Sequence, residues 1–350
     1  MNMLYKLSGP FIRKLSGNQA HDFGIWSLKS GLVQPYKQSF DARLAMDFKG
    51  LKMVHPIGLA PGFDKNAEAV NQLTSIGFGH IEVGAVTPKA QSGNPKPTIF
   101  RDEENQAVIN RMGFNNNGVE EFCQNITGYN HKVPLGVNIG KNKETQDAAS
   151  DYMRLSAGLA DKVDWITINV SSPNTPNLRN LQAIDSLRGI IDTVKNQIAL
   201  IPSPPLLFVK IAPDLNDEDL VELAALFKEE EIDAVVTTNT TISRPQGLDA
   251  EFAAEQGGLS GRPLFELSLE VQKIMATELK GSNVAIIGSG GVYDVETAWQ
   301  RIIYGASLLQ LYTAMIWQGP YLAAEIAQGL TAKLDENGFD TISDAIGSAL

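Results

Sequence analysis

Residues 164–177 read DWITINVSSPNTPN, an apolar segment followed at once by a cluster of polar side chains. The alternating isoleucines, Ile166 and Ile168, are typical of a buried strand. Pro173 and Pro176 restrict the backbone of the polar stretch, so it holds its hydroxyls and carboxamides more firmly than a mobile linker would. Alone, this segment could be an ordinary Ser/Asn turn. The same order of strand and polar loop, however, recurs along the chain.

Eight apolar segments have the length and composition of buried strands: residues 57–60, 80–86, 134–139, 165–170, 206–211, 234–238, 284–287 and 308–311. Segments with helical spacing lie between or after them: residues 67–76, 145–160, 181–198, 217–227, 264–279, 295–304 and 321–330. Such alternation implies parallel crossovers, and eight units most economically close a (β/α)8 TIM barrel of the α/β class. The competing open doubly wound sheet would want a Gly-x-Gly-x-x-Gly turn after its first strand, and residues 59–65, LAPGFDK, are not one.

Charge is distributed unevenly along the 350 residues, whose formal net charge is −11. Residues 1–46 carry six Lys or Arg against two Asp, a net +4, which leaves −15 for the remainder. An acidic body argues against nucleic acid as a partner, because phosphate binding needs a basic face. Cys123 is the only cysteine, which excludes an intramolecular disulfide, and the four histidines lack metal-ligand spacing. We therefore predict no metal site.

The amino terminus has apolar residues at helical spacing on both sides of Ser16-Gly17-Asn18: Met3, Leu4, Leu7, Phe11, Ile12 and Leu15, then Phe23, Trp26, Leu28 and Leu32. This pattern predicts two short amphipathic helices joined by a turn, a small helical hairpin over residues 1–46 that precedes a catalytic barrel over residues 47–340. Charged residues interrupt every apolar run before it reaches spanning length, so we expect neither a secretory signal nor a membrane span. A cap packed on the barrel and an interfacial membrane anchor both fit, and the flanking basic residues favour the membrane.

In a barrel of this class the catalytic face is built from residues just after each strand. Those positions are polar: Lys65, Thr87, Asn138, Lys141, Asn169, Ser172, Asn174, Lys210, Thr238, Asn239, Thr240, Tyr312 and Thr313. Amides, hydroxyls and lysines of this kind can hold a polar ring and stabilise negative charge on it. The glycines of residues 288–291 follow the seventh strand, where barrels often bind phosphate. A plain tight turn is the alternative, but this position favours phosphate.

Nine motifs together resemble the dihydroorotate dehydrogenases, specifically the membrane-associated, quinone-reducing class (class 2). They are GLAPGFDKN at 58–66, EVGAVTPK at 82–89, NRMGFNN at 110–116, GVNIGKNK at 136–143, INVSSPNTP at 168–176, FVKIAPD at 208–214, TTNTT at 237–241, GGLSGRPL at 257–264 and IIGSGGV at 286–292. The resemblance runs from His21 to the final helix. It implies oxidation of dihydroorotate to orotate in pyrimidine synthesis, with FMN as cofactor and ubiquinone or menaquinone as electron acceptor.

The resemblance also implies roles for individual residues. Ser172 is the catalytic base, where the soluble class has cysteine, and Thr175 and Phe114 line the proton exit. The substrate-binding residues are Lys65, Asn110, Arg111, Met112, Gly113, Phe114, Asn169, Asn174, Asn239 and Thr240. The FMN-binding residues are Ala60, Pro61, Gly62, Lys65, Ala85, Asn138, Asn169, Lys210, Thr238, Gly261, Gly290, Gly291, Tyr312 and Thr313. His21 and Arg101 lie near the quinone.

Ser172 would thus take the C5 proton while hydride leaves C6 for the flavin. Ala85 departs from the family, whose members carry a hydroxyl there, so the backbone or Thr87 would have to replace it. The resemblance further implies a monomer, peripheral on the cytoplasmic face of a bacterial inner membrane, with the hairpin giving quinone access from lipid. Three alternatives stay open: a soluble enzyme that uses fumarate or nicotinamide, an aldolase with a Schiff base on Lys210, and a non-enzymatic phosphate-binding module.

Overall fold

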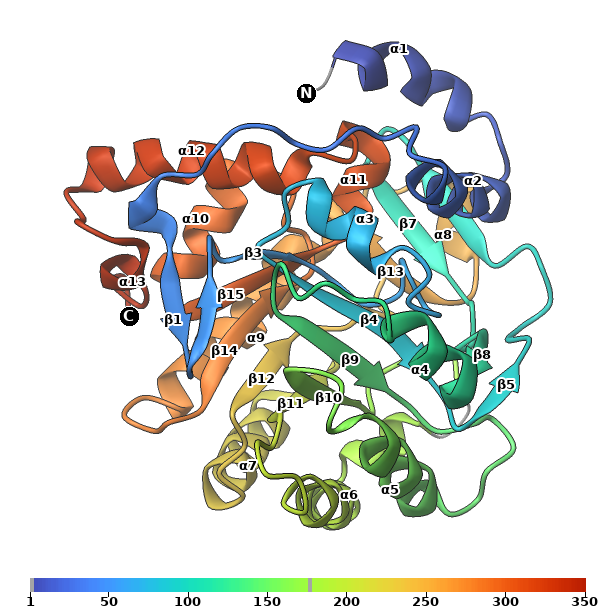
Figure 1. Ribbon diagram of the computed structural model, residues 1–350, viewed down its shortest axis with the longest axis vertical. Helices are drawn as coiled ribbons and strands as arrows, with labels where there is room; N and C mark the ends of the chain where they lie inside the picture. Colours follow the sequence, from blue (N-terminus) through green and yellow to red (C-terminus); the bar gives the residue numbers. More distant parts are fainter. Residues whose placement is uncertain (1–2, 176–177) are drawn as a thin grey trace.

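A closed barrel of eight parallel strands forms the centre of the computed structural model, which describes residues 3–175 and 178–350 (Figure 1). The strands, in spatial as in chain order, are β3 (Ile57–Leu59), β4 (His80–Val86), β9 (Leu135–Ile139), β10 (Trp165–Asn169), β11 (Leu206–Ile211), β12 (Ala234–Thr237), β14 (Ala285–Ser289) and β15 (Ala306–Leu311). β15 pairs with β3 and closes the barrel. The TIM-barrel prediction is therefore confirmed, and the open-sheet alternative is wrong. Pro176, predicted to stiffen the loop after β10, lies outside the described residues.

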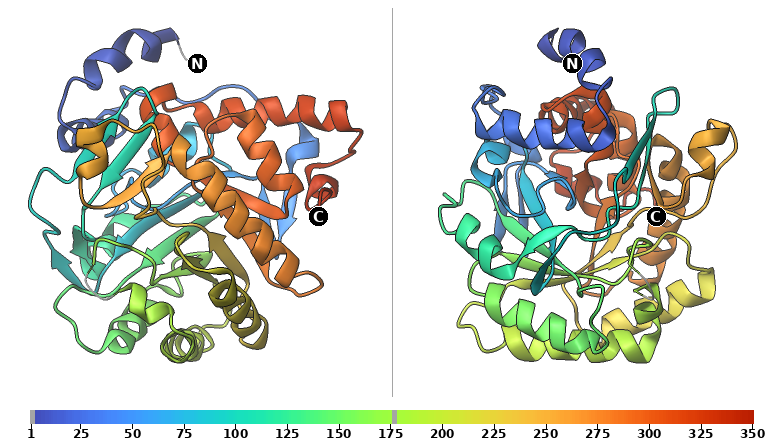
Figure 2. Two further views of the ribbon diagram at one scale, coloured as in Figure 1. Left: turned by 180° about the vertical axis from the view of Figure 1, so that it is seen from behind. Right: turned by 90° about the vertical axis from the view of Figure 1, so that its right-hand side faces the viewer.

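Helices surround the barrel on the outside (Figure 2). They are α3 (Val70–Ser75), α4 (Val119–Ile126), α5 (Ala148–Leu159), α6 (Ile184–Ile198), α7 (Asp217–Glu229), α9 (Phe265–Glu278), α10 (Val295–Ile303) and α12 (Leu322–Asn337). Seven of these were predicted; α4 was not, although Val119, Phe122 and Ile126 are buried at helical spacing. The short helix α13 (Ile342–Ala345) completes the outer layer, whereas the short helix α8 (Ala250–Ala254) packs against β6 (Ile99–Asp102) at the open end of the barrel.

The barrel strands separate two apolar regions. Ile166 and Ile168 belong to the core between the strands and the surrounding helices. Trp165 alternates with them and points into the barrel, where its ring stacks on Phe208 with centroids 5.6 Å apart. The antiparallel hairpin of β1 (Met46–Phe48) and β2 (Leu51–Met53) packs against this interior cluster. The amino-terminal end of the barrel is thereby plugged, and the opposite end carries the site.

Two small antiparallel sheets, which the sequence did not predict, lie over the open end of the barrel. β5 (Lys89–Gln91) pairs with β8 (Asn116–Gly118). β6 (Ile99–Asp102) pairs with β7 (Ala107–Asn110), which pairs in turn with β13 (Gly258–Gly261). The second sheet joins the excursion after β4 to the excursion after β12. A Cβ on Gly258 would lie 1.9 Å from Thr240 Oγ1, so only glycine permits this close approach.

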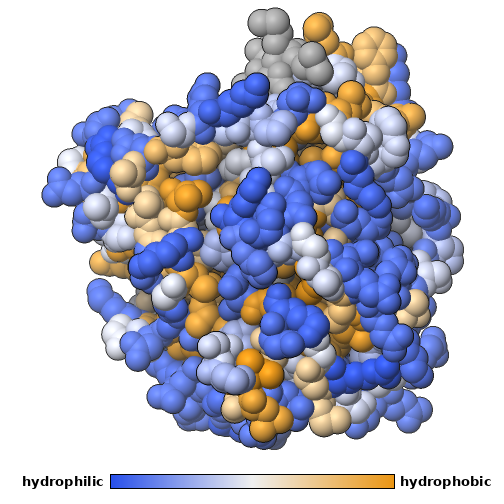
Figure 3. All heavy atoms as spheres, in the orientation of Figure 1, coloured by the Kyte–Doolittle hydropathy of each residue, from blue (hydrophilic) through white to orange (hydrophobic). Residues whose placement is uncertain are grey.

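The two predicted amino-terminal helices are present as α1 (Met3–Ile12) and α2 (Gly17–Lys29). Ser16 caps α2 in a reciprocal capping box with Gln19, which fixes the turn between them. α1 lies against α11 (Thr313–Gln318), and α2 lies against β6 and α3. Leu7 and Phe11 of α1 are 72% and 71% exposed. Apolar atoms accordingly gather at the surface over α1 (Figure 3).

None of the helices in the described part of the chain combines the length and the apolar character that crossing a membrane requires.

Candidate active site

A cavity of about 710 Å³ opens at the carboxyl ends of the barrel strands and extends up to α1 and α2. It brings together Ser172, Lys65 and Lys210, which come from three different strand ends. The other predicted residues that line it are Ala60, Pro61, Gly62, Ala85, Asn110, Met112, Gly113, Phe114, Asn138, Asn169, Asn174, Thr238, Asn239, Thr240, Gly261, Gly290, Gly291, Tyr312, Thr313, His21 and Arg101. Residues spread over most of the chain thus share one site.

A buried carboxylate, Glu82 of β4, fixes the polar floor of this cavity. Its two oxygens accept hydrogen bonds from Asn138 Nδ2 at 2.9 Å, Trp165 Nε1 at 3.1 Å and Gln310 Nε2 at 2.6 Å. Because Asn138 donates to Glu82, its Oδ1 is left to accept from Asn169 Nδ2 at 2.7 Å. The carboxylate of Glu82 therefore fixes the orientation of the amides of Asn138 and Asn169, which are two of the predicted binding residues.

The same order of donors and acceptors continues from Asn169 to Asn239. Asn169 Oδ1 accepts from Asn239 Nδ2 at 3.3 Å, and Asn239 Oδ1 accepts from the backbone N–H of Thr240 at 2.7 Å. The hydroxyl of Tyr152 on α5 donates to the carbonyl of Asn169 at 2.9 Å. A continuous chain of amides therefore presents fixed donors and acceptors to a ligand.

Lys65 and Lys210 supply positive charge to the cavity. Burial lowers the pKa of Lys65 to about 8, and its Nζ donates to the carbonyl of Gly62 at 2.7 Å. Burial also lowers the pKa of Lys210. No hydrogen bond or ion pair serves Lys210 Nζ within the described chain, although Glu82 lies near enough to favour its charged form. Both ammonium groups are thus available to an anionic or carbonyl-rich ligand.

Ser172 lies in the loop after β10, beside residues that come from other elements. Its Oγ accepts from the backbone N–H of Asn174 at 3.3 Å. Asn174 Nδ2 donates to Asn110 Oδ1 at 3.1 Å, and Asn110 ends β7 of the overlying sheet. The carboxamide of Asn110 thus reaches the site from the small sheet of β6, β7 and β13, and not from a barrel strand. Phe114 also lines the cavity and holds φ at +53°, a conformation unusual for a bulky residue and frequent at functional sites.

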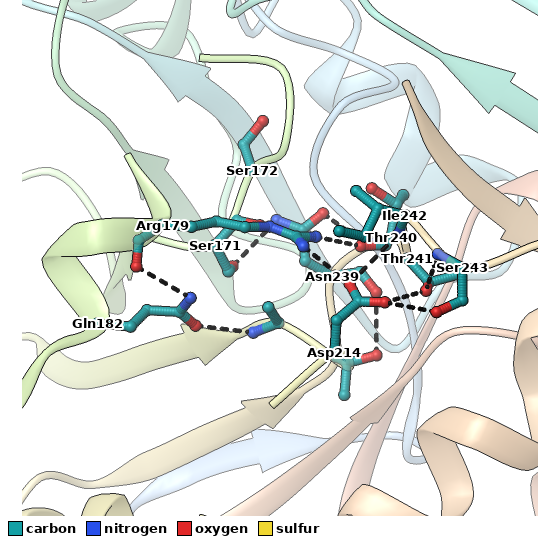
Figure 4. Close-up of polar contacts among 12 residues, drawn as sticks. Ser171, Ser172, Arg179, Gln182, Asp214, Asn239, Thr240, Thr241, Ile242 and Ser243 are labelled. Carbon is teal, nitrogen blue, oxygen red and sulfur yellow. Dashed lines mark hydrogen bonds and ion pairs between the residues drawn. The ribbon is translucent and has the colours of Figure 1, made fainter. Parts of the chain in front are cut away.

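Arg179 ties the Ser172 loop to the next two loops of the barrel (Figure 4). Its guanidinium donates to the carbonyl of Ser171 at 3.1 Å, to the carboxylate of Asp214 at 2.8 Å and to the carbonyl of Thr240 at 2.9 Å. The side chain of Ser172 points away from this network. The network therefore holds the backbone beneath Ser172 and leaves its hydroxyl free to face the cavity.

The outer part of the cavity lies under α2. His21 Nδ1 is 3.2 Å from the hydroxyl of Tyr312, and Phe63 packs edge-on against both rings with centroids 5.6 Å away. Burial, with the charge of Lys65, lowers the pKa of His21 well below its usual value, so it is neutral at pH 7. Arg101 donates to the carbonyls of Arg13 and Leu15 and thereby binds the turn between α1 and α2.

Three residues singled out in the sequence do not line the cavity. Arg111 donates to Glu255 at 2.5 Å and stacks 4.4 Å from the ring centroid of Phe100. Thr175 is buried behind the lining. The hydroxyl of Thr87 donates to the carbonyl of Lys89 at 2.7 Å, an arrangement that favours the backbone over Thr87 as the replacement for the hydroxyl absent at Ala85. The side chain of Arg111 is likewise not placed to bind a ligand in the cavity.

Sequence reasoning missed Glu82, Arg179 and Asp214. A single carboxylate inside the apolar strand HIEVGAV was a signal for Glu82, because a buried charge needs partners. Asp214 falls within the FVKIAPD motif, just after a strand, where polar residues face the site. No sequence signal distinguishes Arg179 from a surface arginine.

Comparison with known proteins agrees with this architecture. The family model described as dihydroorotate dehydrogenase matches residues 43–334. A relative from Cereibacter sphaeroides (strain KD131 / KCTC 12085), named dihydroorotate dehydrogenase (quinone), is 43% identical over 349 residues, covering 99% of this chain and 98% of its own. A relative of the same name from Rhodospirillum rubrum is 42% identical, covering 98% and 94%.

Solved structures give the same result. The crystal structure of DHODH from Eimeria tenella in complex with ferulenol superimposes with a TM-score of 0.91 at 39% identity, covering 95% of each chain. The match thus covers nearly the whole chain. This chain therefore belongs to the dihydroorotate dehydrogenase family.

Proposed function

We propose that this protein oxidises (S)-dihydroorotate to orotate in pyrimidine biosynthesis, with FMN as cofactor and a quinone as the final electron acceptor. The observation that carries the proposal is the convergence of Ser172, Lys65 and Lys210 on one cavity. The relatives named dihydroorotate dehydrogenase (quinone) support the same activity and the quinone as acceptor. The soluble alternative would carry cysteine at position 172, and here that residue is serine.

The residues around the cavity fit FMN. Thr240 Oγ1 and Gln310 Oε1 are buried and have no hydrogen-bond partner in the described chain, as expected of groups that meet a polar ligand. Lys210 is a cation to which residues 3–175 and 178–350 give no direct partner, suited to the ring edge where negative charge develops on reduction. Gly290 and Gly291 supply backbone N–H groups at the end of β14, suited to a phosphate. Bound FMN would supply the site with a hydride acceptor for the substrate and a two-electron donor for the quinone.

The chain's own residues would perform the remaining steps. Ser172 removes the C5 proton of dihydroorotate and passes it onward along the exit lined by Phe114 and Thr175, since a serine hydroxyl cannot retain it. Lys65 binds the substrate carboxylate. Asn110, Asn169, Asn174 and Asn239 bind the pyrimidine carbonyls and N–H groups, with their orientation set by the amide network.

The amino-terminal helices would give the quinone its route. The cavity extends past Tyr312 and Phe63 to residues of α1 and α2, and most of its outer lining there is apolar. The exposed Leu7 and Phe11 suit contact with lipid, and basic residues flank them. We infer attachment to the cytoplasmic face of a bacterial inner membrane through this hairpin, with ubiquinone or menaquinone entering from the bilayer.

An anaerobic titration of the purified protein tests the proposal. We expect a yellow protein whose flavin absorbance bleaches on addition of dihydroorotate and returns on addition of a short-chain quinone. Return of the absorbance with fumarate or a nicotinamide, but not with quinone, would establish the soluble class instead. A colourless protein that is trapped on Lys210 by borohydride and a carbonyl substrate would establish the aldolase.

A further inference from the structure

Arg301 of α10 is a buried cation, and the described part of the chain places no anion beside it. Its side chain is 0% exposed. It donates to Gln272 Oε1 at 2.8 Å, to the carbonyls of Thr237 at 3.4 Å and Gly290 at 2.5 Å, and to Ser268 Oγ. All four acceptors are neutral, and Nε has no partner among the described residues. Among the described residues, Arg301 is therefore an uncompensated positive charge beneath the loop that follows β14.

Such an arrangement is costly unless a counter-charge is brought near. Burial of an unpaired ion costs several kcal/mol, even where hydrogen bonds serve it. Burial lowers the pKa of Arg301 to about 9, so the group is still charged at neutral pH. The Phe265 ring, centred 5.5 Å away, offers only a partial negative face. A neutral residue of similar size would pack here at less cost, which suggests that the charge has a use.

The peptide between Gly290 and Gly291 connects Arg301 to the cavity. Arg301 and Ser268 both donate to the Gly290 carbonyl. This peptide is not among the cis bonds of the chain, so its N–H, which belongs to Gly291, points opposite to the carbonyl and away from Arg301. No acceptor serves this N–H within residues 3–175 and 178–350. Both glycines line the cavity, at φ of +100° and +71°.

The loop is held closely against α9, so the direction of this N–H is fixed. A Cβ on Gly291 would lie 2.6 Å from the backbone nitrogen of Phe265, which begins α9. The cation on one side of the peptide polarises it and strengthens the N–H on the other side as a donor. An anion bound by the Gly291 N–H thus gains both this donor and the field of the buried guanidinium.

We propose that Arg301 is the counter-charge of the FMN phosphate, acting across the Gly290–Gly291 peptide without touching the cofactor. It is a positioning residue that makes the site select a phosphate monoester dianion over an uncharged group. The inference rests on the proposed FMN function and extends it, because it assigns the phosphate preference to a residue outside the cavity lining.

The test compares FMN with riboflavin, which lacks only the phosphate. Kd values of the flavin-free full chain are measured by quenching of flavin fluorescence for the wild type, Arg301→Gln, Arg301→Met and Arg301→Lys. We expect the two neutral variants to weaken FMN roughly ten- to hundredfold, with riboflavin affinity changed little. Arg301→Lys keeps the charge and is expected to keep most of the preference for FMN. Arg188→Gln, which removes a guanidinium paired with Glu229 and Glu230 on the outer surface, is the matched control.

The outcomes separate this inference from the function on which it rests. Equal weakening of FMN and riboflavin in the neutral variants would show a purely structural arginine and overturn the proposal. Gln and Met pack differently at position 301, so whichever of the two variants folds is sufficient for the comparison of FMN with riboflavin. If the wild type binds neither flavin, the proposed function fails and this inference fails with it. A wild type that binds FMN, with an unchanged preference in the neutral variants, overturns the inference alone.

Discussion

Arg179 and Asp214 form an ion pair of 2.8 Å between the loops that follow β10 and β11. The same guanidinium reaches the carbonyls of Ser171 and Thr240, and the same carboxylate accepts from the hydroxyls of Thr241 and Ser243 (Figure 4). Three consecutive strand ends are therefore joined by one pair of side chains. Ser172 follows Ser171 directly, so its position depends on this pair although it contacts neither member.

We expect Arg179→Gln to lower the rate of flavin reduction by dihydroorotate about ten- to hundredfold, because displacement of a reacting group by about 1 Å has costs of this order. Stopped-flow absorbance measures this rate. Arg179→Lys should restore only part of it, since one ammonium group cannot span three acceptors. Arg188→Gln serves again as the surface control. Full activity of Arg179→Gln would show that the loop holds its conformation without the clamp.

Ser172→Ala removes the proposed base and should slow flavin reduction about 10²- to 10⁴-fold. FMN content and orotate affinity should stay close to those of the wild type, because among the described residues the hydroxyl makes one long hydrogen bond, from the Asn174 N–H at 3.3 Å. Ser203→Ala, in an exposed turn before β11, is the control. Retention of the wild-type rate by Ser172→Ala would move the role of base to another residue.

The sequence predicted the barrel because its strands are continuous apolar segments that end in polar loops, a local pattern. It could not predict the position of Asn110, which depends on antiparallel pairing of β7 with β13, about 150 residues away along the chain. The roles of Glu82 and Arg179 were hidden for a similar reason. Their partners come from other strands and loops, so their function exists only once the barrel has closed. The local pattern of strand and polar loop therefore reached the site residues at strand ends, the family resemblance was needed for Asn110, and neither pointed to Glu82 or Arg179.

Glu82→Gln should destabilise the fold, because three donors converge on the carboxylate and an amide would turn a fourth donor toward them. Each buried donor that loses its partner costs about 1–3 kcal/mol. We expect the free energy of unfolding in urea to fall by roughly this amount and the FMN content to fall with it. Glu270→Gln, on the exposed side of α9, should change neither. Unchanged stability of Glu82→Gln would mean that the network rearranges to accept an amide.

Lys65 makes orotate binding dependent on pH. Its pKa of about 8 means that it is mainly protonated at pH 7 and loses its charge above pH 8. The proposed partner, the carboxylate of the ligand, stays ionised throughout, so the Kd of orotate should be constant below pH 8. Above it the Kd should rise, approaching tenfold per pH unit. Flavin difference spectra from pH 6 to 10 measure this dependence. Lys65→Arg should remove the inflection, whereas Lys132→Arg, on the surface, should keep it.

The exposed side chains of α1 predict how the protein attaches to lipid. Leu7 is 72% exposed and Leu200, just beyond the end of α6, is 75% exposed, so the two form a matched pair at different places on the molecule. Insertion of one leucine into the bilayer interface gains about 1.5–3 kcal/mol. Leu7→Asp should therefore weaken binding to anionic phospholipid vesicles at least tenfold in a sedimentation assay.

Comparison of the two positions shows whether vesicle binding depends on insertion of α1 or on exposed apolar side chains anywhere on the surface. Leu200→Asp should leave vesicle binding unchanged, because α6 lies on the side of the barrel opposite α1 (Figure 1). Flavin reduction by dihydroorotate should be the same in both variants, since neither residue lines the cavity. Equal losses of binding in Leu7→Asp and Leu200→Asp would refute the hairpin as the anchor. Quinone reduction in vesicles should fall only in Leu7→Asp, which links the anchor to the supply of the second substrate.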